Sequence, residues 1–163
     1  MLSWLSAART ALRRLVKADR RAASSWNYDD EYRKAGLEVT NAGTMNFTDA
    51  FTANHFKDVT ADSGLVFAAG TTYTITGTLD LNGGVIGNEI ILNSSDNATR
   101  FTFNVTGGVQ NVYYVMVSNS EASSNNILAT FSIKGTNTDA PEGAPRWVFV
   151  GSGPLRGAVM HVD

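Results

Sequence analysis

Few side chains in this sequence have the types and spacing that catalysis or metal binding requires. There is no cysteine, which excludes disulfides, thiolate metal sites and cysteine nucleophiles. The two histidines, His55 and His161, do not have the spacing of a zinc-protease or deaminase motif. The segment Gly151-Ser152-Gly153 lacks the full Gly-x-Ser-x-Gly pattern of an esterase and is interpreted as a turn.

Carboxylates are the remaining candidates for acid–base chemistry or calcium binding. Those that we weighed are Asp49, Asp58, Asp62, Asp80, Glu89, Asp96 and Glu121. No loop has the alternating Asp/Asn spacing with glycine that marks a strong calcium site. The carboxylates are also scattered along the chain, whereas polysaccharide-cleaving enzymes cluster theirs. The sequence therefore predicts a protein that is not an enzyme and has no catalytic residue, metal or cofactor.

Composition and charge divide the chain into unlike parts. Of its 163 residues, 43% are hydrophobic and 17% charged, which suits one compact domain. Residues 1–22 hold six of the 13 basic and one of the 15 acidic residues, so they carry +5. The rest, with seven basic and 14 acidic residues, carries −7. All 15 glycines follow residue 35. We expect an anchor and connector at 1–35, a β-rich domain at 36–150 and a C-terminal tail at 151–163.

The segment 1–22 has the periodicity of an amphipathic helix, with leucines on one side and basic residues on the other. Because so short a helix is marginal unless its apolar stripe is buried, we predict that it docks on its own domain or on a neighbouring subunit. The interface residues that we assign are Leu5, Leu12, Leu15 and Val16 on the apolar side and Arg9, Arg13, Arg14 and Lys17 on the basic side.

Other interpretations of this segment stay open. Its interleaved Arg and Leu argue against a secretory signal, although the segment resembles a mitochondrial transit peptide, and a membrane-surface helix is physically possible. We expect no specific nucleic-acid binding, because no groove-reading pattern accompanies the basic residues. The apolar runs are far shorter than the roughly 20 residues of a transmembrane helix, so no transmembrane segment is expected.

The β-rich region shows alternating apolar residues in 73–81 and in 101–105, which predicts strands. Further candidate strands are 65–67, 89–92, 112–117, 127–133 and 147–150. Turns with positive φ are expected where Gly and Asn gather, at 82–84, 93–97, 107–108 and 118–120. We place Phe101, Phe103, Val115 and Val117 in the core. The segment 112–117, apolar at both alternating sets of positions, is predicted to be a strand covered on both sides.

Residues 68–149 resemble the right-handed parallel β-helix modules of bacterial surface proteins and phage virion proteins. The resemblance rests on the closing Trp147-Val148-Phe149 and on five stretches before it, 69–79, 82–84, 87–95, 101–105 and 110–122. It implies a mainly β fold, a short parallel β-helix or β-solenoid following the N-terminal α-helix, and a structural or binding role. From strand spacing alone, a β-sandwich or jelly roll is the alternative. The open ends of a short solenoid need caps, and the N-terminal helix is one candidate.

These features together favour a non-enzymatic structural protein of a phage virion, either a capsid decoration or head-fibre protein or a tail-associated fibre or adaptor. A virion protein is made in the cytosol, which fits a chain that starts at Met1 with no recognisable export signal. Its expected partners are other virion proteins and copies of itself, a trimer being one candidate, with a host-surface glycan as a candidate ligand. The alternative is a bacterial cell-surface adhesin or filament subunit.

Overall fold

The computed structural model describes residues 36–40, 42–139 and 145–151, and these residues form a mainly β body. The predicted anchor helix lies outside them, as does the tail beyond Gly151. No helix occurs in the described ranges, and hence none that could cross a membrane. The strands are β1 (Gly36–Val39), β2 (Thr44–Phe47), β3 (Thr52–Asp58), β4 (Gly64–Phe67), β5 (Thr72–Asn82), β6 (Ile90–Ser94), β7 (Phe101–Val105), β8 (Val109–Tyr113), β9 (Val115–Val117), β10 (Ser120–Ser123), β11 (Ile127–Thr130), β12 (Ile133–Lys134) and β13 (Trp147–Val150).

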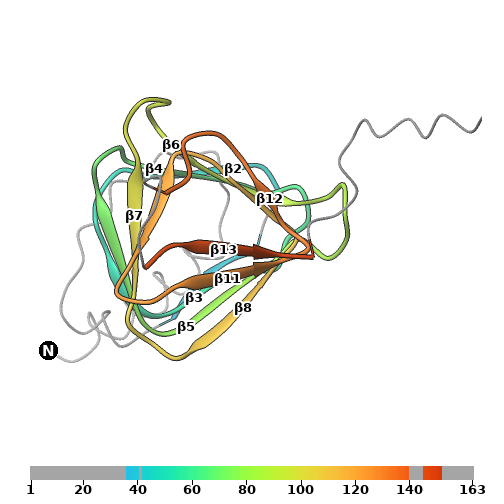
Figure 1. The fold of residues 1–163 in the computed structure, drawn as a ribbon, viewed down its shortest axis with the longest axis horizontal. Coiled ribbons are helices and arrows are strands. Elements are labelled where there is room, and N and C mark those ends of the chain that lie inside the picture. The colour runs from blue at the N-terminus through green and yellow to red at the C-terminus, as the bar shows by residue number, and fades with distance from the viewer. Residues whose placement is uncertain (1–35, 41, 140–144, 152–163) are drawn as a thin grey trace, which may run out of the picture.

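The strands pair in parallel and wind around one core with a triangular outline (Figure 1). Face 1 stacks β1, the ends of β3 and β5, β8, β11 and β13. Face 2 stacks β2, β4, β6, β9 and β12. Face 3 stacks the start of β3, the start of β5, β7 and β10. Each strand thus lies beside its counterparts one coil earlier and one coil later. The sandwich alternative, in contrast, is built from antiparallel sheets.

Coil length varies because two loops are inserted in the middle of the body. On face 1, Leu81 pairs with Val112 of the next coil, and Val112 pairs in turn with Ala129 of the coil after that. The first of these two coils is much the longer, because it contains the segments 83–89 and 95–100, which connect β5 to β6 and β6 to β7. Both loops stand out from the triangular body in Figure 1. A fixed sequence repeat is therefore absent even though the backbone stacking is regular.

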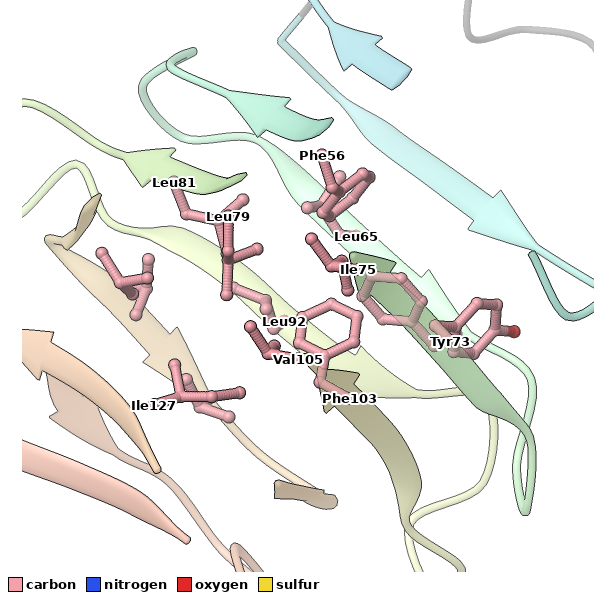
Figure 2. Close-up of a cluster of buried hydrophobic side chains, with 14 of the residues drawn as sticks. Phe56, Leu65, Tyr73, Ile75, Leu79, Leu81, Leu92, Phe103, Val105 and Ile127 are labelled. Carbon is pink, nitrogen blue, oxygen red and sulfur yellow. The ribbon is translucent and has the colours of Figure 1, made fainter. Parts of the chain in front are cut away.

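The core is richest in aromatic side chains in the early coils. In the early coils the rings of Phe47 and Phe67 stack at 4.9 Å, and those of Phe67 and Phe101 at 4.4 Å. Tyr73 fills the same region, with its hydroxyl donating to the carbonyl oxygen of Phe47 at 2.9 Å. In the later coils Ala122 takes the register position of Phe103. Figure 2 shows the buried cluster that joins these coils.

The predicted strands and core are confirmed where alternation was the signal. Tyr73, Ile75, Leu79 and Leu81 all point inward from β5 and are fully buried. Phe101, Phe103, Val115 and Val117 are fully buried as well. Asn119 has a φ of 51° and Gly84 a φ of 91°, in the turns where positive φ was predicted. Alternation works here because one side of each strand faces the core.

The prediction of one strand over 112–117, covered on both sides, is wrong. β8 ends at Tyr113, β9 begins at Val115, and Tyr114 between them has a φ of 50°. The chain turns a corner there, so Val112 and Val115 point inward while the side chain of Tyr113 stays exposed. The predicted strand 127–133 is likewise divided, into β11 and β12, at Phe131. Hydropathy could not reveal these corners, because both halves of each segment are apolar.

Candidate interaction surface

Two long edges of the triangular body border face 2, and they carry contrasting residues at positive φ. On the edge between faces 2 and 3, Asn119 and Asn137 each have a φ of 51°. On the edge between faces 1 and 2, Tyr114 and Phe131 each have a φ of 50°. Asparagine visits this conformation readily, whereas for most other non-glycine residues it costs about 1–2 kcal/mol. On the edge between faces 1 and 2, aromatic residues therefore adopt a backbone conformation that is energetically unfavourable for them.

The edge between faces 2 and 3 is held together by a ladder of asparagine amides, and we call it the asparagine edge. Asn119 Nδ2 donates to Asn93 Oδ1 at 2.8 Å. Asn137 Nδ2 donates to Asn119 Oδ1 at 3.0 Å. Asn119, in the middle, is only 2% exposed. The three amides lie on successive coils and satisfy one another, as buried polar groups require.

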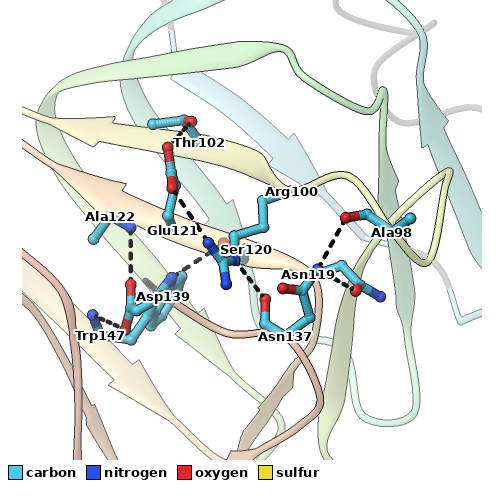
Figure 3. Close-up of polar contacts among 10 residues, drawn as sticks. All are labelled: Ala98, Arg100, Thr102, Asn119, Ser120, Glu121, Ala122, Asn137, Asp139 and Trp147. Atoms are coloured by element: carbon cyan, nitrogen blue, oxygen red, sulfur yellow. Dashed lines mark hydrogen bonds and ion pairs between the residues drawn. The ribbon is translucent and has the colours of Figure 1, made fainter. Parts of the chain in front are cut away.

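Arg100 and Glu121 extend the polar contacts from the asparagine edge onto face 3 (Figure 3). Arg100 Nε donates to the carbonyl oxygen of Asn137 at 2.9 Å, and its Nη1 lies 4.0 Å from Glu121 Oε2. The hydroxyl of Thr102 donates to Glu121 Oε1 at 3.1 Å. These groups are partly exposed, so the ion pair contributes little stability. They tie neighbouring coils to one another.

Asp139 and Trp147 fasten the last coil to the one before it. The Asp139 carboxylate accepts the backbone N–H of Trp147 at 2.8 Å and that of Ala122 at 3.3 Å. The indole Nε1 of Trp147 donates to the Ser120 hydroxyl at 3.1 Å. Burial raises the pKa of Asp139, an effect that its two N–H donors and the more distant charges of Lys134 and Arg100 partly offset. The role of Asp139 is thus structural, at the C-terminal end of the described body.

The edge between faces 1 and 2 is apolar on its outside. The rings of Tyr114 and Phe131 stack there with centroids 5.7 Å apart and an interplanar angle of 16°. On successive coils, Gly83 precedes this pair and Gly151 follows it at the same corner. Six apolar or aromatic side chains at and around the stack are each 38–56% exposed, and we call this surface the apolar edge: Val85, Ile86, Ile91, Tyr113, Phe131 and Ile133.

The apolar edge was the principal surface feature that sequence reasoning missed. Its signal was the continuous apolar segment 112–117, which we assigned to a doubly covered strand. The anchor residues predicted from the sequence are a separate matter: Leu5, Leu12, Leu15, Val16, Arg9, Arg13, Arg14 and Lys17 all lie outside the described residues. Their role stays a prediction.

Several of the carboxylates weighed as ligands accept hydrogen bonds from nearby groups of the body. Asp58 is fully buried, and its two oxygens accept the Thr60 N–H at 2.9 Å and the Ser63 hydroxyl at 2.7 Å. Asp96 accepts the Ala98 N–H at 2.9 Å within its own loop. His55 contacts the neighbouring Asn54 side chain at 3.2 Å. Within the described residues, no three His, Asp or Glu side chains gather closely enough to hold a metal ion.

Comparison with known proteins identifies no relative. No protein-family model, curated protein or solved structure matches this chain. The features that bear on function are therefore the sequence pattern, the parallel-stranded body and its two contrasting edges.

Proposed function

We propose that this protein is a non-enzymatic structural component of a phage virion, a decoration, head-fibre, tail-fibre or adaptor protein. In this proposal the body is a short parallel β-helix that is displayed on the particle. The N-terminal amphipathic segment attaches it to another virion protein. The observation that carries the proposal is the stack of parallel strands around one core, together with the sequence resemblance to β-helix modules of virion proteins.

The charge distribution supports separate roles for the N-terminal segment, which attaches, and the β body, which is displayed. The described residues contain nine acidic and four basic side chains, a net charge of −5. Residues 1–22 carry +5 and a leucine stripe. Opposite charge steers the segment toward an acidic partner surface, while burial of leucine side chains supplies the larger part of the binding energy, at about 25 cal/mol per Å² of apolar surface. Such a body and such a segment suit display and attachment respectively.

The anchor proposal is tested by changing the leucine stripe and counting copies in purified particles. Tagged chains are expressed in host cells during phage production, and particle-bound copies are quantified by mass spectrometry. Leu12→Asp with Leu15→Asp should reduce incorporation at least about tenfold, because two charges then replace buried leucines. Neutralising Arg13, Arg14 and Lys17 should mainly slow association and weaken its salt dependence, because surface charge acts chiefly on encounter.

The matched control places the same charges on the body. Val109 and Leu128 are exposed on face 1 at 53% and 49%, so Val109→Asp with Leu128→Asp adds two aspartates without touching the segment. This control should incorporate as the unmodified chain does. Wild-type occupancy of the leucine variant would reject the anchor. Recovery of the chain from bacterial surfaces without particles would instead favour the adhesin or filament alternative.

A further inference from the structure

The corner between β5 and β6 contains the one Asn-Gly pair of this chain, Asn82-Gly83. In such a pair the backbone nitrogen that follows the asparagine can attack the side-chain amide carbon, because glycine has no Cβ that crowds its nitrogen. The attack releases the side-chain amide as ammonia, a reaction called deamidation. Asn82 is the last residue of β5 and is partly exposed, so water and hydroxide can reach it.

The fold requires glycine at position 83 and therefore retains this reactive pair. A Cβ on Gly83 would lie 2.5 Å from the carbonyl oxygen of Tyr114 and 2.6 Å from that of Asn88. Both oxygens belong to the main chain, which cannot move aside without disturbing the packed coil. Any side chain at position 83 would slow deamidation, but none fits at this corner.

Two hydrogen bonds hold the reacting groups in an unreactive arrangement. The Gly83 N–H donates to the carbonyl oxygen of Tyr113 at 3.2 Å. The Gly84 N–H donates to Asn82 Oδ1 at 2.8 Å and fixes the side chain. The attack requires the first bond to break, so that the Gly83 nitrogen can lose its proton and turn toward the side chain, and it requires the side chain to rotate. The closed corner therefore opposes the reaction that its sequence favours.

We propose that Asn82 is a deamidation site that the closed corner protects and that reacts when this corner opens locally. Surface loops open at a lower free energy than core strands do. In the open state the Gly83 nitrogen gives its proton to hydroxide and bonds to Asn82 Cγ, and the Cγ–Nδ2 bond breaks to release ammonia. Water then opens the resulting succinimide ring at either carbonyl, which gives aspartate or isoaspartate. The overall reaction consumes one water and releases one ammonia, with no oxidation or reduction.

The two products differ in whether the corner can close again. Aspartate keeps the original main chain, and its carboxylate can still accept the Gly84 N–H. Isoaspartate carries the main chain through the side-chain carbon, which adds one backbone atom where Asn82 pairs with Tyr113 across β5 and β8. Because the pairing register fixes which side chains face the core, the strand cannot absorb this addition. Opening of the corner is thereby recorded as a permanent covalent change.

The test measures deamidation at individual asparagines of the full-length unmodified chain by peptide mass spectrometry, in mildly alkaline buffer with and without guanidinium chloride. Asn82 should react at least about tenfold more slowly in the folded chain than in the unfolded chain, because only the open fraction reacts. In the unfolded chain it should react faster than Asn93 and Asn119, each of which is followed by serine. Equal rates at Asn82 in the folded and unfolded chains would overturn the protection. The absence of a reaction in the unfolded chain would overturn the site itself.

Two glycine variants of the same loop test the contact that fixes the side chain. Gly84 and Gly87 have φ values of 91° and 101°, and a Cβ on either would meet no further atom within 4 Å. The Gly84 N–H binds Asn82, whereas the Gly87 N–H donates to Glu89 Oε1 at 2.9 Å. Gly84→Ala should raise the rate at Asn82 in the folded chain at least about fivefold, because releasing the contact relieves the strain of alanine at positive φ. Gly87→Ala, which is strained in the same way, should leave this rate near that of the unmodified chain.

Equal rates at Asn82 in the two glycine variants would overturn the protective role of the Gly84 contact. If Gly84→Ala does not fold, the comparison of the folded with the unfolded unmodified chain still decides whether the corner protects Asn82. None of these measurements involves a virion, so their outcome is independent of the proposed function.

Discussion

The asparagine edge and the apolar edge solve the same geometric problem with opposite chemistry. Both turn the chain between adjacent faces with residues at a φ near 50° on successive coils. On the asparagine edge these residues hydrogen-bond to one another, with amide contacts of 2.8 and 3.0 Å. On the apolar edge they stack at 5.7 Å and are flanked by exposed aliphatic side chains. The polar groups of the asparagine edge therefore satisfy one another, whereas the apolar edge leaves apolar surface exposed.

The two edges should therefore contribute differently to the stability of the fold. A satisfied amide ladder contributes to stability because breaking it leaves buried polar groups without partners. A partly exposed stack contributes its modest ring contact, while its backbone conformation costs free energy. Substitutions at equivalent corners should therefore have unequal effects on folding.

The largest effect on folding is expected at the centre of the amide ladder. Asn119→Ala removes both amide hydrogen bonds and leaves a residue that disfavours positive φ, so it should cost about 2–4 kcal/mol of unfolding free energy. Urea denaturation at fixed protein concentration measures this loss. The matched change Tyr114→Ala removes only ring stacking, worth about 0.5–1.5 kcal/mol. Equal losses for the two variants would contradict the contrast between the edges.

An intermediate effect is expected at Asp139, where the last coil is fastened. Asp139→Asn turns an amide NH₂ toward one of the two backbone N–H donors, of Trp147 or Ala122, and should cost about 1–3 kcal/mol at neutral pH. Asparagine is close to aspartate in size, so the loss reports the hydrogen bonds rather than packing.

The pH dependence of the unfolding free energy, compared between the unmodified protein and Asp139→Asn, gives a second test. Because burial raises the pKa of Asp139 in the folded state, the folded chain binds this proton more tightly than the unfolded chain. The contribution of this group to stability is therefore largest below the unfolded pKa of about 3.9 and falls as pH rises through the folded pKa. From neutral to acidic pH, the unmodified protein should gain stability relative to Asp139→Asn. A difference that stays constant with pH would contradict this assignment.

The smallest effect on folding is expected on the apolar edge. Phe131→Gly loses the ring stack with Tyr114 but relieves the unfavourable φ, so the two terms nearly cancel and unfolding free energy should change by less than about 1 kcal/mol. Asn119→Gly relieves φ in the same way yet loses the ladder, and should still cost about 1–3 kcal/mol. Thermal or urea unfolding distinguishes the two. A large loss for Phe131→Gly would show that the aromatic corner belongs to the fold's own stabilising contacts.

Sequence reasoning succeeded where a single strand faces the core throughout. The alternation in 73–81 and 101–105 predicted which side chains point inward, because successive residues of a strand face opposite sides. It also placed positive φ in the turn at Asn119, since asparagine accepts that conformation. The mainly β character of residues 36–150 followed from the same local signals.

The tertiary structure alone decided which residues of different coils meet. Asn93, Asn119 and Asn137 are unequally spaced along the chain, so no repeat in the sequence marks them as a ladder. Their stacking depends on coil lengths, which the inserted loops change from one coil to the next. The apolar edge was hidden for a related reason. A corner at Tyr114 resets the alternation between β8 and β9, so hydropathy alone could not separate the buried Val115 from the exposed Tyr113.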